Sequence, residues 1–348
     1  MINPNTFTAE HIQSIRGDSK HDPSLIERSI FALGLLEALT RAELPFIFKG
    51  GTSLMLLMDK PRRFSTDIDL VVAPGVDVEK YLERAAVIWP FMQMKEDVRF
   101  ENSGIEKRHI RFTYTSPRNN KESSTLLDIL YEENPYSTTI AKNIDNELLV
   151  TEDPAISVLI PNANCIIADK LTAFAPYTTG IKYDINKELE IIKQLYDIAA
   201  LLDYIDNFAE IISAYNKIVR TEIAYRSLDV STTDVLNDTI NTAACVAGRG
   251  KRNPEDYAKL RNGVVSIRNH IFYETFNGEV AVQRACMVMY LAAAVLTEQI
   301  TLPLFRNDDY YKSADIDFGA FHDLRYVRKM DMLAYKYLVE AIKMLLGQ

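Results

Sequence analysis

Two spacings of apolar residues alternate along the first 205 residues of the chain. Apolar side chains recur at helical spacing over residues 24–44, and helices are also predicted at 76–90, 164–174 and 187–204. Short apolar or alternating runs predict strands at residues 46–48, 67–72, 109–114 and 125–131. A polar turn separates the last two runs, which predicts that they form a hairpin.

Beyond residue 205 the pattern becomes entirely helical. Apolar residues recur every three or four positions in five segments, residues 208–226, 232–246, 254–273, 280–300 and 324–346. The chain is therefore predicted to be α+β, with a mixed sheet flanked by helices and then an all-helical bundle. We expect the first domain to cover residues 1–205 and the second to cover residues 206–348.

The composition is that of a globular protein without a membrane segment. Of the 348 residues, 47% are hydrophobic and 25% are charged. Three widely spaced cysteines form no zinc or disulfide pattern, and the polar start lacks a signal peptide, so we expect a cytoplasmic protein. The most apolar stretch, residues 281–296, contains Arg284 and is too short to span a membrane. A net charge of −9 argues against general binding of nucleic acid but leaves room for a local groove.

Residues 46–72 carry the candidate chemistry. A short strand leads into Gly50 and Gly51, whose small size lets the backbone approach a bulky anion. A helix starting near Thr52 or Ser53 would offer its first N–H groups to phosphate, with the two hydroxyls capping that turn. Asp67 and Asp69 then share one face of a strand, where two neighbouring carboxylates favour a bound Mg²⁺ or Mn²⁺ ion.

Asp128 interrupts the apolar strand predicted at residues 125–131. A carboxylate in such a run is costly unless it has a partner or a cation. We therefore expect a partner group or a cation at Asp128, with Glu132 and Glu133 as rivals for the same role. The alternative is that Asp128 faces solvent on an edge strand.

The segments KGGTSL and RFSTDIDLVV resemble nucleotidyltransferases of the polymerase-beta type, and more narrowly the AbiEii/AbiGii toxin family. That resemblance implies a polymerase-beta-like core. It also implies a third carboxylate on a later strand, here Asp128, which completes the metal site or takes the proton of the attacking hydroxyl. The later segments IIADKLTAF and IKQLYDIAAL match two further family motifs. Through them it implies that Lys170 contacts nucleotide phosphates and that Asp197 positions Lys170 or the metal. The residues that it implies for nucleotide binding are Lys49, Gly50, Gly51, Thr52, Ser53, Arg63 and Ser65.

These observations predict a metal-dependent transfer of a nucleoside monophosphate from an NTP to a hydroxyl. The resemblance implies a toxin of a toxin–antitoxin or phage-defence system, with a tRNA 3′ end as acceptor and a cognate antitoxin as partner. A basic cluster, Arg249, Lys251 and Arg252, offers one place for RNA phosphates, or else a solvated loop. Two alternatives stay open: a small-molecule or protein hydroxyl as acceptor, and a module that binds NTP without catalysis.

Overall fold

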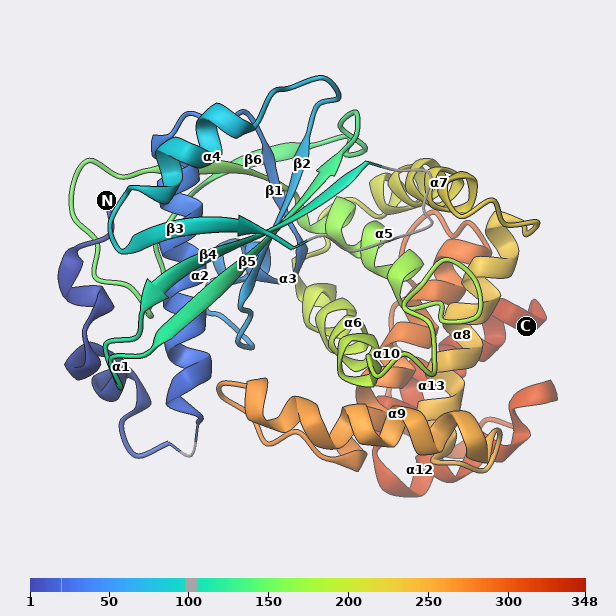
Figure 1. Ribbon diagram of the computed structural model, residues 1–348. Helices are drawn as coiled ribbons and strands as arrows, with labels where there is room; N and C mark the ends of the chain where they lie inside the picture. The colour runs from blue at the N-terminus through green and yellow to red at the C-terminus, as the bar shows by residue number, and fades with distance from the viewer. Residues whose placement is uncertain (20, 98–105) are drawn as a thin grey trace. The chain divides into compact units, whose positions relative to one another are not determined.

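The computed structural model describes residues 1–19, 21–97 and 106–348 (Figure 1). By its internal contacts the chain separates into two compact units. The first comprises Met1–Asn162 together with Asn269–Glu274, and the second comprises Ala163–Arg268 and Thr275–Gln348. The packing therefore divides the chain at residue 162, not near residue 205. The limits of the expected functional domains stay a prediction.

The first unit is built on a mixed sheet of five strands in the order β1-β2-β5-β4-β3. β2 and β5 run parallel, and the other neighbouring pairs are antiparallel (Figure 1). A separate antiparallel pair joins β6 to β7. The strands are β1 Ile47–Lys49, β2 Asp67–Val72, β3 Phe91–Glu96, β4 Lys107–Thr115, β5 Glu122–Tyr131, β6 Thr139–Asn143 and β7 Ser157–Pro161.

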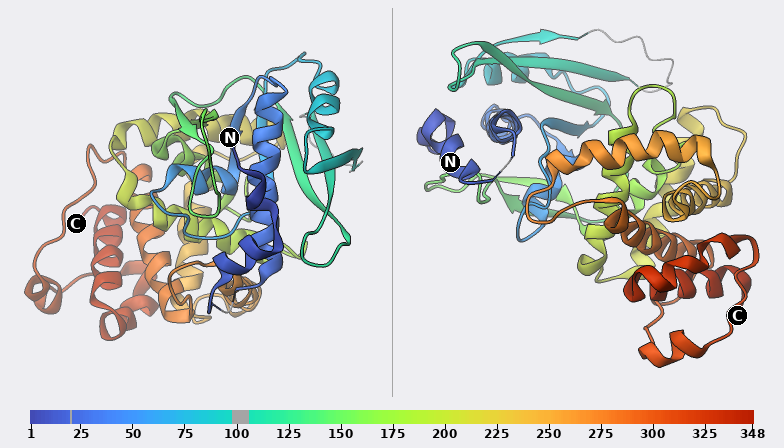
Figure 2. Two further views of the ribbon diagram at one scale, coloured as in Figure 1. Left: turned by 90° about the vertical axis from the view of Figure 1, so that its left-hand side faces the viewer. Right: turned by 90° about the horizontal axis from the view of Figure 1, so that it is seen from below.

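One face of the five-stranded sheet is the core of the first unit. Residues on alternate positions of β2, β5 and β4 are fully buried there, among them Ile68, Leu127 and Phe112. Helix α2 covers this face, with Phe31 stacked on Tyr114 at a ring-centroid distance of 3.6 Å (Figures 1 and 2). The helices of this unit are η1 Pro4–Phe7, α1 Ala9–Arg16, α2 Pro23–Arg41, α3 Gly50–Leu57 and α4 Glu79–Ala86.

The second unit is helical throughout its described elements (Figure 2). Its centre is α10, which packs against α6, α8 and α13. By length and composition α10 passes as a membrane span, but 72% of its most apolar window is buried inside the protein. The elements are α5 Ala163–Ala173, α6 Glu188–Leu201, η2 Leu202–Tyr204, α7 Phe208–Tyr225, α8 Thr232–Gly248, α9 Pro254–Ser266, η3 Ile267–His270, α10 Gly278–Leu296, α11 Asp308–Ser313, η4 Gly319–Tyr326, α12 Val327–Met330 and α13 Met332–Leu346.

Short polar side chains set the starts of these helices. An N-terminal turn has backbone N–H groups without helical partners, and an Asn, Ser or Asp oxygen just before the helix can accept from them. The structure shows such caps at α7, α8, α9, α10, α11 and α13, made by Asn207, Ser231, Asn253, Asn277, Asn307 and Asp331. The five helical segments read from the sequence are confirmed in their main part, but two of them need correction. The helix expected at residues 254–273 ends at Ser266, and the helix expected at 324–346 is broken at Asp331, whose extended backbone and side chain cap α13.

Three expectations about the first unit need correction. Helix α3 begins at Gly50, two residues before the expected start. The polar lead-in contains η1 and α1, because Asn3 and Thr8 cap their first turns. The sequence predicts a core position for Trp89, the large apolar residue near the end of the segment 76–90, but it is 59% exposed, with its ring edge-to-face with that of Phe7.

The segment 269–274 packs in the first unit although its sequence neighbours belong to the second. It pairs with the basic loop before β2: Phe64 N–H donates to His270 O at 2.7 Å, and Phe272 N–H donates to Arg62 O at 3.0 Å. The Phe272 ring also lies 3.9 Å from the Phe64 ring. This segment therefore holds the loop that connects the glycine turn to the aspartate strand.

Candidate functional site

Four polar residues form a row across the face of the sheet opposite the core. Lys49 of β1 pairs with Asp69 of β2, Asp69 pairs with Asp128 of β5, and Asp128 pairs with His109 of β4. Directly paired residues in a sheet project to the same face, so the four side chains lie side by side. The register therefore places Asp128 on the same face of the sheet as Asp69.

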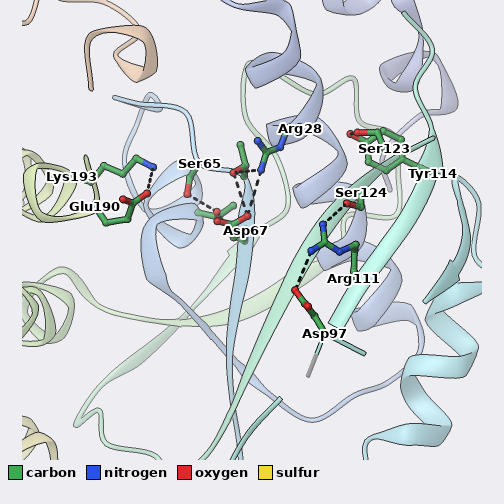
Figure 3. A network of polar contacts seen from close by, with 12 residues as sticks. Arg28, Ser65, Asp67, Asp97, Arg111, Tyr114, Ser123, Ser124, Glu190 and Lys193 are labelled. Atoms are coloured by element: carbon green, nitrogen blue, oxygen red, sulfur yellow. Dashed lines mark hydrogen bonds and ion pairs between the residues drawn. The ribbon is translucent and has the colours of Figure 1, made fainter. Parts of the chain in front are cut away.

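Asp67 lies two residues before Asp69 and shares its face of the sheet. Ile68 and Leu70, on the opposite face, are buried, whereas both aspartates are partly exposed. The Asp67 carboxylate lies 3.9 Å from the Arg28 guanidinium of α2, and about half of each side chain is exposed (Figure 3). Figure 3 also shows Arg111 on the same sheet face, bonded to Asp97 at 3.0 Å. The two aspartates thus face outward beside cationic side chains.

The glycine turn lies directly against the aspartate strand. Gly50 has φ +77°, and a Cβ built on it would lie 2.0 Å from Asp69 Oδ2. A Cβ on Gly51 would lie 2.5 Å from Arg63 Nη2 and 2.9 Å from Ser65 Oγ. Only glycine fits at either position, because any side chain there would displace the polar groups beside it. The turn, the carboxylate and the arginine are therefore parts of one constellation.

Helix α3 presents its first turn at the same place. Lys49 precedes the helix, and its side chain makes no capping hydrogen bond. The N–H groups of a first helical turn have no acceptor within the helix and are suited to binding an anion. The hydroxyls of Thr52 and Ser53 do not cap the helix, which corrects the expectation from the sequence. Both residues are fully buried: Thr52 donates to Asp67 O at 2.5 Å and Ser53 donates to Gly50 O at 2.8 Å. A contact of Thr52 and Ser53 with a nucleotide stays a prediction.

Arg63 is a buried cation beside the turn, with 6% of its surface exposed. Its Nη1 donates to Phe64 O at 3.1 Å, while Nη2 faces Gly51. The bridge between Arg63 and Ile271 fixes its backbone. Ser65 accepts a hydrogen bond from Thr52 Oγ1 at 2.8 Å. The predicted nucleotide-binding residues Arg63 and Ser65 thus both lie at the glycine turn.

A divalent cation fits the Asp67–Asp69 pair by its chemistry, since Mg²⁺ is commonly held by one or two carboxylates and substrate phosphates. The expected set of three carboxylates is not assembled, however. Among the residues that the structure describes, no group of three acidic, His or Cys side chains is arranged to hold a metal ion. Asp128 is bonded instead to His109, so its place in a metal site stays a prediction.

In the second unit the two later motif residues form a buried ion pair. Lys170 Nζ of α5 lies 2.7 Å from Asp197 Oδ2 of α6, and the two side chains are 7% and 2% exposed. Lys170 also donates to Gln194 Oε1 at 3.1 Å. The structure thus brings the two motif residues into direct contact. Their action on a nucleotide stays a prediction.

The basic cluster in the second unit is occupied by contacts within the protein. Arg252 donates to Asp323 at 2.8 Å and to Ala320 O at 2.7 Å, and the Lys251 ammonium lies 4.2 Å from the Tyr326 ring centre. Arg252 in particular is tied to the following helical segment. The cluster therefore offers fewer available charges to RNA than its sequence indicates.

Family comparison adds a separate line of evidence. Residues 35–266 match the model of a family described as nucleotidyl transferase AbiEii toxin, Type IV TA system. The match covers well over half of the chain and includes the glycine turn, Asp67, Asp69, Asp128, Lys170 and Asp197. The chain belongs to the AbiEii toxin family.

The solved structures that match the chain share little sequence identity with it. JHP933 from Helicobacter pylori is 15% identical, with a TM-score of 0.43, and the similarity covers 78% of the AbiEii-family chain and 93% of JHP933. An antigenic nucleotidyltransferase-like protein from Paracoccidioides brasiliensis is 14% identical, with a TM-score of 0.37. The similarity covers 58% of the AbiEii-family chain and 91% of the Paracoccidioides protein. No curated protein matches the chain at a significant level.

Two polar residues of this AbiEii-family site were missed from the sequence. The sequence pattern assigns no role to His109, yet the hairpin register places it beside Asp128. The sequence could have predicted this register from the hairpin. If the turn pairs Thr115 with Glu122, the antiparallel register also pairs His109 with Asp128. Arg28 gave no signal, since its approach to Asp67 depends on how α2 packs on the sheet.

Proposed function

We propose that this AbiEii-family protein transfers a nucleoside monophosphate from an NTP to an acceptor hydroxyl and releases pyrophosphate. The observation that carries the proposal is the contact between the glycine turn and the aspartate strand. Gly50 abuts the Asp69 carboxylate, so the first N–H groups of α3 and the Asp67–Asp69 pair face one locality. A triphosphate placed there would meet donors and acids together.

Three tasks of the proposed reaction would fall to residues of the first unit: binding the phosphates, holding the metal ion and accepting the proton. The α3 N–H groups and Arg63 would bind the phosphates, because both present positive charge to an anion. Asp67 and Asp69 would hold Mg²⁺ or Mn²⁺, which when bound supplies charge neutralisation of the phosphates. Asp128, whose side chain is 31% exposed, would take the proton of the acceptor hydroxyl.

The bond changes in this proposal balance without a further reactant. The acceptor oxygen forms a bond to the α-phosphorus, and the bond between that phosphorus and the bridging oxygen to the β-phosphate breaks. The electron pair leaves with pyrophosphate, and the hydroxyl proton passes to Asp128. Lys170 and Asp197 belong to the second unit, and their part in the reaction stays a prediction of the family motif.

The acceptor that we propose is the 3′ end of a tRNA, following the toxin family, with a cognate antitoxin encoded alongside. The acidic net charge of −9 makes a small-molecule or protein hydroxyl the second candidate. An NTP-binding module without catalysis is a third candidate, but both glycines and both aspartates of the motif are present. Nuclease and protease treatment of a labelled product would separate RNA, protein and small-molecule acceptors.

The test is a labelling reaction with each of the four NTPs, Mg²⁺ and total tRNA. Label on the α-phosphate should appear in the acceptor, whereas label on the γ-phosphate should appear in pyrophosphate. Asp69→Ala should abolish transfer, and Glu83→Ala should not, because Glu83 is an exposed acid on α4. Transfer of the γ-label, full activity of Asp69→Ala, or no labelled acceptor with any NTP would overturn the proposal.

A further inference from the structure

The Asp128 carboxylate has a partner that the family motifs do not include. His109 Nδ1 lies 2.7 Å from Asp128 Oδ1, across the β4–β5 hairpin. The histidine side chain is 10% exposed and the aspartate side chain 31% exposed. One member of the pair is therefore enclosed by the protein, and the other reaches the open face of the sheet.

The chemistry of the two groups fixes the direction of this hydrogen bond. An ionised carboxylate can only accept, so Nδ1 of His109 carries the proton and donates it to Oδ1. The bond uses Oδ1, and Oδ2 takes no part in it. Because the ring belongs to a strand in the middle of the sheet, it limits rotation of the carboxylate about its side-chain bonds.

The position of the pair argues against a role in the hydrophobic core alone. The core face of the hairpin is formed by the neighbouring residues, such as Ile110, Leu127 and Ile129, which are almost fully buried. His109 and Asp128 lie on the other face, in the row that holds Asp69. An apolar cross-strand pair would stabilise a hairpin as well, so the polar pair at this level points to the chemistry of Asp69 and Asp128.

We propose that His109 is a positioning residue, which holds Asp128 in the orientation needed to take the acceptor's proton. This inference rests on the proposed transferase function. Partners that orient a functional carboxylate or histidine in this way typically change activity by about 10- to 100-fold when removed. His109 itself touches neither nucleotide nor acceptor in this scheme.

Three substitutions of His109 distinguish the loss of its hydrogen bond to Asp128 from a change in side-chain volume. His109→Ala removes the donor, and His109→Asn places an amide N–H where Nδ1 stands. His109→Gln carries its amide further out, near the position of Nε2, and so serves as the matched control for size and polarity. We expect kcat to fall about 10- to 100-fold in His109→Ala and His109→Gln, and by less than about threefold in His109→Asn. The KM for NTP should stay within about twofold throughout.

A double-mutant cycle tests whether His109 acts through Asp128. In the Asp128→Asn background, where the residual rate is already low, His109→Ala should cause no further loss of kcat. Thr115→Ala, an exposed change on the same strand, serves as the control for general damage to β4. An equal loss from His109→Ala in both backgrounds, or rescue by Gln as good as by Asn, would overturn the inference.

A readout without catalysis is the protonation of the imidazole itself. In ¹⁵N NMR of the whole protein, His109 should show a proton on Nδ1, and Asp128→Ala should shift the neutral ring toward the form protonated on Nε2. An unchanged ring state in Asp128→Ala would refute the hydrogen bond. If the wild type transfers nucleotide but His109→Ala is fully active, this inference fails alone. If the wild type shows no transfer, the proposed function fails and the inference fails with it.

Discussion

The contact between Gly50 and Asp69 yields a prediction whose size can be worked out from the structure. Gly50→Ala places a methyl group 2.0 Å from Asp69 Oδ2 and 2.7 Å from its Cγ, which is far inside van der Waals contact. The substitution also forces alanine into a left-handed backbone at φ +77°. The first effect is a clash and the second is backbone strain, and each has its own free-energy cost.

The variant Gly75→Ala measures the free-energy cost of backbone strain without a clash. Its φ is +82°, and a Cβ there would meet nothing within 4 Å. A left-handed alanine costs about 1–2 kcal/mol, offset by about 0.4–1 kcal/mol because alanine restricts the unfolded chain. Gly75→Ala should therefore lower the free energy of unfolding by about 1 kcal/mol. Gly50→Ala should lower it by about 2–4 kcal/mol, since overpacking adds about 1–3 kcal/mol.

The assay is chemical denaturation of both variants, together with the labelling reaction at a temperature where both stay folded. Gly50→Ala should lose transfer, because Asp69 has to move to make room, while Gly75→Ala should stay active. In an Asp69→Ala background the clashing oxygen and Cγ are gone and only the Cβ contact at 3.0 Å remains, so adding Gly50→Ala should cost only slightly more than Gly75→Ala does. Equal destabilisation by Gly50→Ala and Gly75→Ala in the wild-type background would show that a side chain at position 50 does not clash with Asp69, and would refute the reasoning.

Two further predictions concern buried charges of the second unit. Lys170→Met should lower the free energy of unfolding by about 3–5 kcal/mol, because Asp197 is left as an uncompensated buried charge, whereas Lys170→Met with Asp197→Leu should recover part of the loss. Thermal unfolding checks this, and additive losses in the double variant would contradict it. Burial raises the pKa of Asp238, although its bonds from Thr178 and Tyr177 oppose the shift. The folded state then binds the proton more tightly than the unfolded state, so wild-type stability should fall relative to Asp238→Asn as pH rises from about 4 toward 7. A difference in melting temperature that is the same at both pH values would refute this.

The sequence was most informative where a local pattern decides the structure. The DIDLVV run forms β2 with both acids on one face, and the hairpin of β4 and β5 forms as expected, because alternation along a strand needs no distant partner. Spacing of apolar residues also located the long helices of the second unit. The fold class follows from these elements and is confirmed by the structure.

The misses arise where tertiary contacts override local preference. Thr52 and Ser53 look like helix caps, but burial turns their hydroxyls onto backbone carbonyls, and α3 starts earlier. β3, with the sequence FMQMKE, has no clean alternation and is defined by its pairing with β4. The Arg28–Asp67 approach depends on packing between elements, which no single stretch of sequence encodes.

The return of segment 269–274 to the first unit has a consequence for how this protein can be divided. A fragment that ends at Asn162 would lack the strand-like clasp that His270 and Phe272 provide to the loop carrying Arg63. A gene fragment that encodes only residues 1–162 therefore cannot give an N-terminal unit in which the loop carrying Arg63 keeps these hydrogen bonds. A chimera with a relative would have to exchange residues 1–162 and 269–274 together, so that the loop and the segment that binds it come from the same protein.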